Sequence, residues 1–471
     1  DAFRSVSRYF DRITRPEQIL SSLPQAINTM LDPSDCGPAV ISMSQDVQGE
    51  AYEYPEIFFE EIIHEIRTIH PDPKQINIAA ENLKNSKQPI IISGGGVLYS
   101  EAEEEISSFA KKHNIPVIAT VMGIGCMQKD DPFYIGATGG LGEGSANNLS
   151  RDTDLALAIG TKLADFTTAS WTNFQNEDFK LVSVNTSRFD TVKHRAFPVV
   201  SDAKIGLKEL SKALGDWRAP NGWYQRAIEE KIKWEEYVAK ESGPTNQELP
   251  SYAHAVGAVY RNSDPSDIVV TAAGGLVGEV VQIWKPKEIN TFETEWGFSC
   301  MGYEISGALG IKMAKPDQDV VVFVGDGSYL LQNSDIYSSV LYDKKLIIVV
   351  CDNGGHMVIN RLQLAKGGKE YLCNLNAAGA TNLQFVDFEA HAKSMGANAE
   401  TVKSTSELEA AFKRAKASDK TYVISMKTDG YEWLEGTAFW DSPTLQVSST
   451  KENKAAYEEF VDGKNKQRKG V

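Results

Sequence analysis

Apolar runs of four or five residues recur along the middle of the chain, separated by stretches whose hydrophobic positions follow helical spacing. The runs typical of buried strands occupy residues 89–93, 115–119, 155–159 and 181–184. An acidic stretch with helical spacing, residues 100–113, lies between the first two. Strands that are apolar at every position and alternate with helices are typical of a parallel sheet covered on both faces. The pattern predicts a compact α/β domain over residues 76–215.

A second series of apolar runs predicts another parallel-sheet α/β domain over residues 247–430. Its strands are expected at residues 268–271, 320–324, 346–351 and 422–426. Between the two domains, residues 216–246 are rich in charge and helical in pattern, which indicates a helical linker. The remainder, residues 431–471, is expected to form a C-terminal extension that ends in a solvated helix.

The first 75 residues contain too few predicted elements to form a domain alone. Apolar positions from Ile19 to Met30 lie on one face of a helix, and residues 39–43 form one short apolar strand. One helix and one strand cannot enclose a core. We therefore expect residues 1–50 to be the end of a domain whose remainder lies outside the chain, followed by a connector over residues 51–75.

The net charge and the cysteines of the chain exclude some classes of partner and some cellular environments. The formal net charge of −16 argues against nucleic acid or an anionic membrane as a partner, because both need a basic surface. The five cysteines lie far apart and form no CxxC pair, which indicates reduced thiols. No apolar run reaches membrane-spanning length, and the first residues show no signal peptide. We expect a soluble, cytoplasmic protein, and the start at Asp1 in place of Met suggests that this is not the native start.

A Gly-Asp-Gly-Ser segment, residues 325–328, follows the predicted strand 320–324, and a helical pattern resumes from about Leu331. Ligands of parallel sheets usually bind at the carboxyl edge of the strands, where this segment is expected. Glycines there let the backbone approach a phosphate, and a following helix N-terminus favours negative charge. Asp326 offers a hard oxygen of the kind that Mg²⁺ prefers. At a strand end, the same segment can equally be an ordinary turn.

The next predicted strand ends in Asp352 and Asn353, followed by two glycines, again at the carboxyl edge. One helix and one strand separate Asp326 from Asn353, so adjacent parallel strands would bring their oxygen atoms to the same ion. The backbone carbonyl near Gly355 would be a third ligand. The pair predicts a Mg²⁺ site that bridges a diphosphate, with two unrelated loop ends as the alternative.

This pairing resembles the cofactor-binding motif of enzymes that depend on thiamine diphosphate (ThDP). Residues 87–96, 115–123 and 154–160 are similar to the central domain of the acetolactate-synthase-like branch of that family. The resemblance implies an α/β fold of parallel-sheet three-layer domains, the ThDP-binding fold, with a central Rossmann-like α/β domain. It also implies ThDP and Mg²⁺ as cofactors, and it makes residues 247–430 the diphosphate-binding domain. We interpret the glycine run 94–96 as structural and not as a nucleotide loop.

The resemblance assigns further residues to the cofactor. Ser299 would offer its carbonyl oxygen to the amino group of the pyrimidine ring. Met301 would be the apolar wedge that bends the cofactor, with ordinary core filling as the alternative. Asp326, Asn353 and Gly355 would hold the metal. The diphosphate would be contacted by Gly274, Gly275, Gly325, Gly327 and Ser328.

Residues 37–40 and 44–47 are similar to the close of the family's pyrimidine-binding domain, which makes residues 1–50 the C-terminal remnant of that domain. The family's catalytic glutamate would lie in the absent part, so no catalytic glutamate is assigned. His356 is a candidate catalytic residue, as an acid/base or as a substrate contact, and an exposed loop histidine is the alternative. Polar side chains that would contact substrate hydroxyls, or else be solvated, are those of Asn360, Arg361 and Gln363.

Residues 298–310, 358–368 and 436–443 are similar to one subgroup, the hydrolases that open trihydroxycyclohexane-1,2-dione in myo-inositol catabolism. Residues 370–381 fit this subgroup less well. The resemblance implies a C–C bond hydrolase that converts a small cyclic diketone to 5-deoxy-glucuronic acid and assembles as a homodimer or homotetramer. The alternatives are an acetolactate-synthase-like carboligase, a 2-oxo acid decarboxylase, and an inert subunit without the pyrimidine domain.

Overall fold

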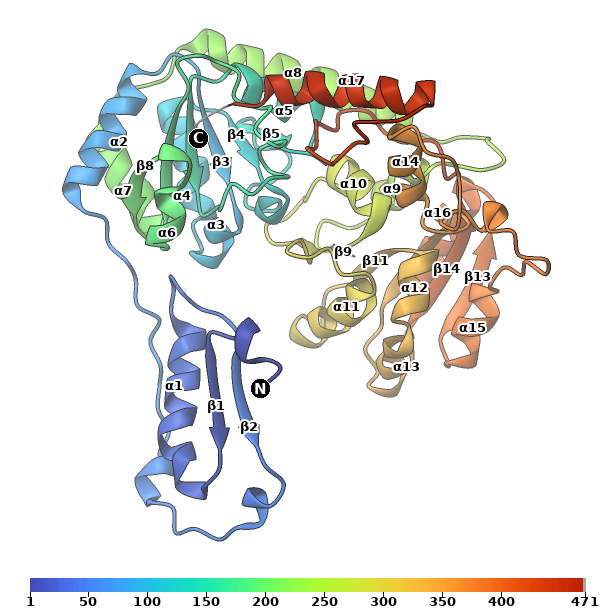
Figure 1. Cartoon of the computed structure of the whole chain (residues 1–471), viewed down its shortest axis with the longest axis horizontal. Helices are drawn as coiled ribbons and strands as arrows, with labels where there is room; N and C mark the ends of the chain where they lie inside the picture. Colours follow the sequence, from blue (N-terminus) through green and yellow to red (C-terminus); the bar gives the residue numbers. More distant parts are fainter. Residues whose placement is uncertain (469–471) are drawn as a thin grey trace.

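The computed structural model describes residues 1–468 and contains two six-stranded sheets (Figure 1). The first sheet, in the order β5-β4-β3-β6-β7-β8, consists of β3 (Pro89–Ser93), β4 (Val117–Ala119), β5 (Tyr134–Ala137), β6 (Leu155–Ile159), β7 (Lys180–Asn185) and β8 (Phe197–Val200). The second, in the order β10-β9-β11-β12-β14-β13, consists of β9 (Ile268–Thr271), β10 (Phe292–Thr294), β11 (Val320–Gly325), β12 (Ile347–Asp352), β13 (Asn398–Val402) and β14 (Tyr422–Lys427). All pairs of neighbouring strands are parallel, which confirms the predicted fold class.

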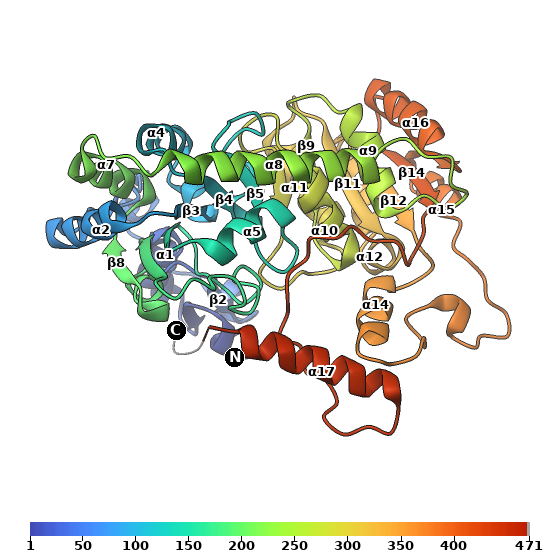
Figure 2. The same cartoon turned by 90° about the horizontal axis from the view of Figure 1, so that it is seen from above.

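Helices cover both faces of the first sheet, as its continuously apolar strands require. Strands β3 and β6 are buried at every position. One face packs against α2 (Pro73–Asn85), α4 (Glu103–His113) and α7 (Ala203–Leu214). The other face packs against α5 (Gly144–Asp152) and the long α8 (Asn221–Glu241), which runs along the domain toward the second sheet (Figure 2).

The second sheet is covered in the same way. On one face lie α9 (Tyr252–Arg261), α10 (Gly274–Ile283) and α16 (Thr405–Ala417). On the other lie α11 (Tyr303–Ala314), α13 (Ser334–Leu341) and α15 (Phe388–Ser394). Two short helices, α12 (Asp326–Leu331) and α14 (Met357–Ala365), start at the carboxyl edge of the sheet, directly after β11 and shortly after β12. The loops that follow β11 and β12, which contain Asp326 and Asn353, therefore lie at that edge.

The N-terminal unit projects away from both sheets (Figure 1). It consists of two parallel strands, β1 (Tyr9–Ile13) and β2 (Ala39–Met43), with α1 (Ile19–Leu31) between them in the chain. We predicted the helix and the second strand but not β1, because Asp11 and Arg12 interrupt its apolar pattern. Beyond this unit, the chain as far as α2 forms only short single turns and exposes apolar side chains: Ile57, Phe59, Ile62, Ile63 and Ile66.

Several element bounds differ from the prediction. The helix expected from about Leu331 begins at Asp326, and a second helix, α13, follows after a break at Gln332. The acidic helix expected at residues 100–113 is α4, which starts at Glu103 and follows the separate short helix α3 (Gly95–Tyr99). The C-terminal extension reaches α17 (Lys451–Lys466), and its residues 469–471 lie outside the described part of the chain.

Candidate active site

A cleft of about 2260 Å³ is lined by the carboxyl edge of the second sheet, by Gly96 and Gly160 at the carboxyl edge of the first sheet, and by residues 30–33 of the N-terminal unit. Its lining includes every residue that we predicted for the cofactor, the metal and the acid/base role: Gly274, Gly275, Ser299, Met301, Gly325, Asp326, Gly327, Ser328, Asn353, Gly355 and His356. These residues come from four segments that are distant in sequence. The parallel topology brings them together because β9, β11 and β12 are adjacent and end at the same edge.

The two predicted metal-binding loops are in direct contact. Strands β11 and β12 pair in register, with Gly325 opposite Cys351, so Asp326 starts its helix beside the end of β12. The backbone N–H of Gly355 donates to Asp326 Oδ2 at 2.7 Å. Asn353 Oδ1 is buried and has no hydrogen-bond partner. An unpaired buried amide oxygen costs free energy, so its position in the same cleft as the Asp326 carboxylate fits a cation site.

The charges around Asp326 also fit a bound cation. Burial and the nearby carboxylate of Asp352 raise the pKa of Asp326 to about 7, although three backbone N–H groups partly offset the rise. Lys427 Nζ lies 3.0 Å from Asp352 Oδ2 and compensates that second carboxylate. Within residues 1–468, no group of three or more His, Cys, Asp or Glu is placed to hold a metal ion. A cation here would therefore depend on the amide and carbonyl oxygens beside Asp326.

The two glycines after Asn353 are required by the backbone. Gly354 and Gly355 have φ of +80° and +138°, a region that side chains disfavour. A Cβ on Gly355 would also overlap the carbonyl group of Cys373. The backbone N–H of Leu375 donates to the carbonyl oxygen of Gly354 at 3.0 Å. The stretch around Cys373, in the region that fits the subgroup less well, thus supports the predicted metal loop from behind.

Gly327, His356 and Met301 meet at one point of the cleft. A Cβ on Gly327 would lie 2.6 Å from His356 Cε1 and 3.4 Å from Met301 Cε. Met301 is 37% exposed and lines the cleft, so core filling does not describe it. His356 is exposed, as the simpler interpretation expected, but it also lines the cleft and directly precedes α14.

Two carboxylates hold the loop that carries Ser299, and the sequence reasoning missed both. Glu304 is 1% exposed and accepts from the backbone N–H groups of Gly302 at 2.8 Å and Ala273 at 3.3 Å. Burial raises its pKa, although these backbone hydrogen bonds oppose the rise. Glu295 accepts from the backbone N–H of Cys300 at 2.7 Å. Ser299 itself has φ of +52°, and its hydroxyl donates to the carbonyl oxygen of Ala272 at 3.0 Å.

Trp433, which follows β14, was also missed. Gly275 lies in the first turn of α10, and a Cβ on it would come within 2.5 Å of Trp433 Cη2. The lack of a side chain at Gly275 therefore serves the close approach of this indole. Gly274, with φ of +77°, has open space around it.

The polar residues of α14 have separate environments. Asn360 is 1% exposed and its side-chain N–H donates to Glu370 at 2.9 Å, whereas its amide oxygen is buried and has no hydrogen-bond partner within residues 1–468. The guanidinium of Arg361 lies 5.0 Å from the ring centre of Trp433 and lines the cleft. Gln363 is half-buried, and its backbone carbonyl accepts from Gly368 at 2.9 Å.

The glycine run of the first sheet has a packing role. A Cβ on Gly96 would lie 2.6 Å from the Cα of Gly160, and a Cβ on Gly94 would overlap the carbonyl oxygen of the same residue. The ends of β3 and β6 can approach this closely only without side chains. The structural interpretation of this run therefore has a physical basis.

Comparison with known proteins identifies the family. The family described as "Thiamine pyrophosphate enzyme, central domain" matches residues 76–210, and "Thiamine pyrophosphate enzyme, C-terminal TPP binding domain" matches residues 272–426. The 3D-(3,5/4)-trihydroxycyclohexane-1,2-dione hydrolases of Shouchella clausii and Bacillus subtilis are each 36% identical to the chain over 97% of its length and 76% of theirs. That of Listeria monocytogenes serotype 4b is 37% identical over 98% of the chain and 76% of its own length. The chain belongs to this hydrolase family.

Membership of the hydrolase family agrees with the position of the cleft. The residues predicted to bind ThDP and the metal, from Gly274 to Gly355, all lie inside the matched TPP-binding domain. In residues 1–468, no helix combines the length and the apolar character needed to cross a membrane.

Proposed function

We propose that the protein is a ThDP- and Mg²⁺-dependent hydrolase that cleaves a C–C bond of trihydroxycyclohexane-1,2-dione and yields 5-deoxy-glucuronic acid in inositol catabolism. The observation that carries the proposal is the 36% identity over 97% of the chain to hydrolases named for this substrate. It is supported by the meeting of Asp326 and Gly355 beside the unpaired oxygen of Asn353.

Three oxygen donors are proposed to hold Mg²⁺: the Asp326 carboxylate, the Asn353 amide oxygen and the Gly355 carbonyl. Gly325, Gly327 and Ser328, with Gly274 and Gly275 opposite, would contact the diphosphate. Ser299 and Met301 would contact the aminopyrimidine end. Supporting this assignment, all of these residues line one cleft, and a side chain at Gly327 would collide with His356.

When bound, ThDP supplies an electron sink for the bond that breaks. The residues of this chain provide binding, orientation and proton transfer. Asp326 and Asn353 would anchor the charged end through the metal, and Met301 would make apolar contact with the aminopyrimidine end. His356 is proposed to donate or accept a proton at the substrate, because its ring lies beside Gly327 and Met301 and is open to the cleft.

We also propose a homodimer or homotetramer in the cytoplasm. Six large hydrophobic side chains stand exposed in the connector, among them Ile63 at 82% and Phe59 at 71%, and a partner subunit would cover them. All five cysteines are free, which fits a reducing compartment.

The test is turnover by the chain together with any sequence that its gene encodes before Asp1. With ThDP and Mg²⁺, we expect release of one acid equivalent from trihydroxycyclohexane-1,2-dione, followed in a pH-stat, and no consumption of pyruvate. Removal of the metal with EDTA should lower the rate by about 100-fold or more, and Mg²⁺ should restore it. Consumption of pyruvate would favour a carboligase or decarboxylase, and inactivity toward both substrates would favour an inert subunit.

A further inference from the structure

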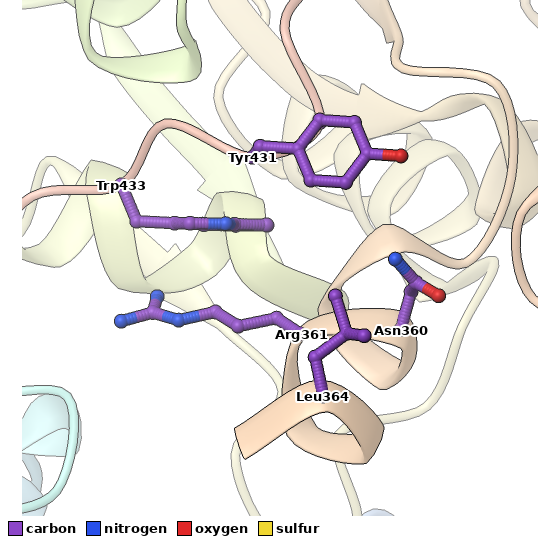
Figure 3. A pocket seen from close by; sticks show the side chains of 6 residues that line it. Asn360, Arg361, Leu364, Tyr431 and Trp433 are labelled. Atoms are coloured by element: carbon purple, nitrogen blue, oxygen red, sulfur yellow. The ribbon is translucent and has the colours of Figure 1, made fainter. Parts of the chain in front are cut away.

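A second, smaller cavity lies beside the cleft (Figure 3). Its volume is about 330 Å³, at the lower end of the roughly 300–1,000 Å³ typical of small-molecule sites. Its walls come from α14 and from the segment after β14: Asn360, Arg361, Leu364, Gly430, Tyr431 and Trp433. Arg361 lines both this cavity and the cleft, so the two spaces adjoin at its side chain.

Arg361 forms no ion pair within residues 1–468, although the carboxylate of Glu279 is near enough to act on its charge. In residues 1–468, no hydrogen bond or ion pair engages its guanidinium, which lies 5.0 Å from the ring centre of Trp433 and extends beneath that ring (Figure 3). Partial burial lowers its pKa, and the carboxylate of Glu279 partly offsets this effect. An arginine keeps its charge even then, and its planar fork of N–H donors matches a carboxylate. The cavity therefore offers a preformed position for an anion.

The remaining walls suit a hydroxylated carbon chain. The Tyr431 hydroxyl donates to Glu370 Oε1 at 2.6 Å, and the Asn360 amide donates to the same oxygen at 2.9 Å, which fixes both side chains. Glu370 does not line the cavity, and its carboxylate also accepts from the Asn374 amide at 3.4 Å. The face of Trp433 and the side chain of Leu364 provide apolar contact for C–H groups.

We propose that this cavity binds a small hydroxylated monocarboxylate and that Arg361 takes its carboxylate. The identity of the acid rests on the proposed function: the cyclic diketone is neutral, whereas the ring-opened product carries a carboxylate. The charge of Arg361 then distinguishes product from substrate at the edge of the cleft. The product leaves the reacting centre toward this cavity, and the neutral substrate is not held there.

The test measures binding without turnover. Isothermal titration of the ThDP-free protein with sodium D-glucuronate should show binding, and neutral D-glucose should bind at least about tenfold more weakly. Arg361→Gln should weaken glucuronate binding about tenfold or more. Arg226→Gln is the matched control, because Arg226 also lies over a tryptophan, 5.8 Å from the ring centre of Trp223, but far from the cavity. This control should bind glucuronate as the unaltered protein does.

A cavity-filling variant locates the bound acid. Leu364 is 39% exposed and lines the small cavity but not the cleft, so Leu364→Trp should abolish glucuronate binding while ThDP binding persists. Equal binding of glucose and glucuronate, undiminished binding by Arg361→Gln or Leu364→Trp, or no binding to the unaltered protein would overturn the proposal. Diketone turnover without glucuronate binding refutes this inference alone. Arg361-dependent binding without diketone turnover refutes the proposed function alone.

Discussion

The two six-stranded domains share one architecture but use their carboxyl edges differently. In the first, Gly94 and Gly96 after β3 pack closely against the backbone of Gly160, and Gly96 and Gly160 also line the cleft. In the second, Gly327 and Gly355 stand next to a buried carboxylate and an amide oxygen without a partner. Glycine at the end of a strand is thus common to both. Within residues 1–468, the unpaired buried oxygen of Asn353 marks the second of these two edges.

The largest expected effect is on cofactor binding, and it comes from replacing the carboxylate of Asp326. A carboxylate of the first domain serves as the comparison. Asp326→Ala should weaken the binding of Mg²⁺ and ThDP by about 100-fold or more, because it removes an anionic metal ligand. The fold should persist, since the backbone N–H groups that donate to this carboxylate lie in the loop after β12 and in the first turn of α12, outside the core of the sheet. Isothermal titration measures the affinity, and circular dichroism the fold.

Asp154 in the first domain is the matched comparison. Its carboxylate accepts from the backbone N–H groups of Lys87 at 2.7 Å and Gln88 at 3.0 Å, and it is remote from the cleft. Asp154→Ala should therefore lower the melting temperature and leave ThDP affinity unchanged. Unchanged cofactor affinity in Asp326→Ala would refute the metal assignment.

A smaller effect, on the pH dependence of stability, is expected from the buried carboxylate of Glu279 on α10. Burial raises its pKa to about 7, and one carboxylate oxygen is buried without a partner while the other accepts from the Leu434 N–H at 3.1 Å. Because the folded protein holds this proton more tightly than the unfolded chain does, stability is present below pH 4.5 and is lost as the pH rises through 7. The loss is about 3 kcal/mol.

Glu279→Gln should remove this pH dependence, since the amide keeps the acceptor for Leu434 but cannot ionise. Urea unfolding at pH 5 and pH 8 measures the difference. In the first domain, Glu143 is also buried but pairs with Lys285, so Glu143→Gln should destabilise the protein at both pH values. Parallel pH profiles for the unaltered protein and Glu279→Gln would contradict the assignment.

The smallest effect is expected when one glycine at the carboxyl edge of each sheet is replaced by alanine, and the quantity compared is the free energy of unfolding. Gly94→Ala would force a Cβ against the backbone of Gly160, which should cost about 2 kcal/mol of unfolding free energy. Gly327→Ala meets only the ends of the His356 and Met301 side chains, which can move. We expect this second variant to fold with nearly unchanged stability but to bind ThDP more weakly. Equal destabilisation by both substitutions would remove the distinction between the edges.

The core strands were predictable because their physical signal is local. Strands β3, β6, β11 and β12 are apolar at nearly every position, and their ends carry the glycines, Asp326 and Asn353. The short outer strands were not predicted. Polar residues interrupt the pattern of β13, a glycine interrupts β5 and a proline interrupts β8, so tertiary pairing decides their conformation.

The hydrophobic pattern of the sequence does not predict contacts between distant segments. Trp433 lies on Gly275, and Glu304 holds the backbone of Ala273, yet neither partner is marked by spacing or composition. Two acidic residues, Glu295 and Glu304, do flank the Gly-Phe-Ser-Cys-Met-Gly segment. The position of these two carboxylates on either side of a glycine-containing loop was the only feature of the sequence that could have predicted that they hold the loop in place.

The position of Trp433 has a consequence for biosynthesis. The indole that lies on the first turn of α10 is translated more than 150 residues after that turn. A ribosome-bound chain that has just passed Asn353 already carries both proposed metal-binding side chains, but the tryptophan that packs against the first turn of α10 is still missing. The first turn of α10, which carries Gly274 and Gly275, therefore gains this packing partner only when the later part of the polypeptide has emerged from the exit tunnel.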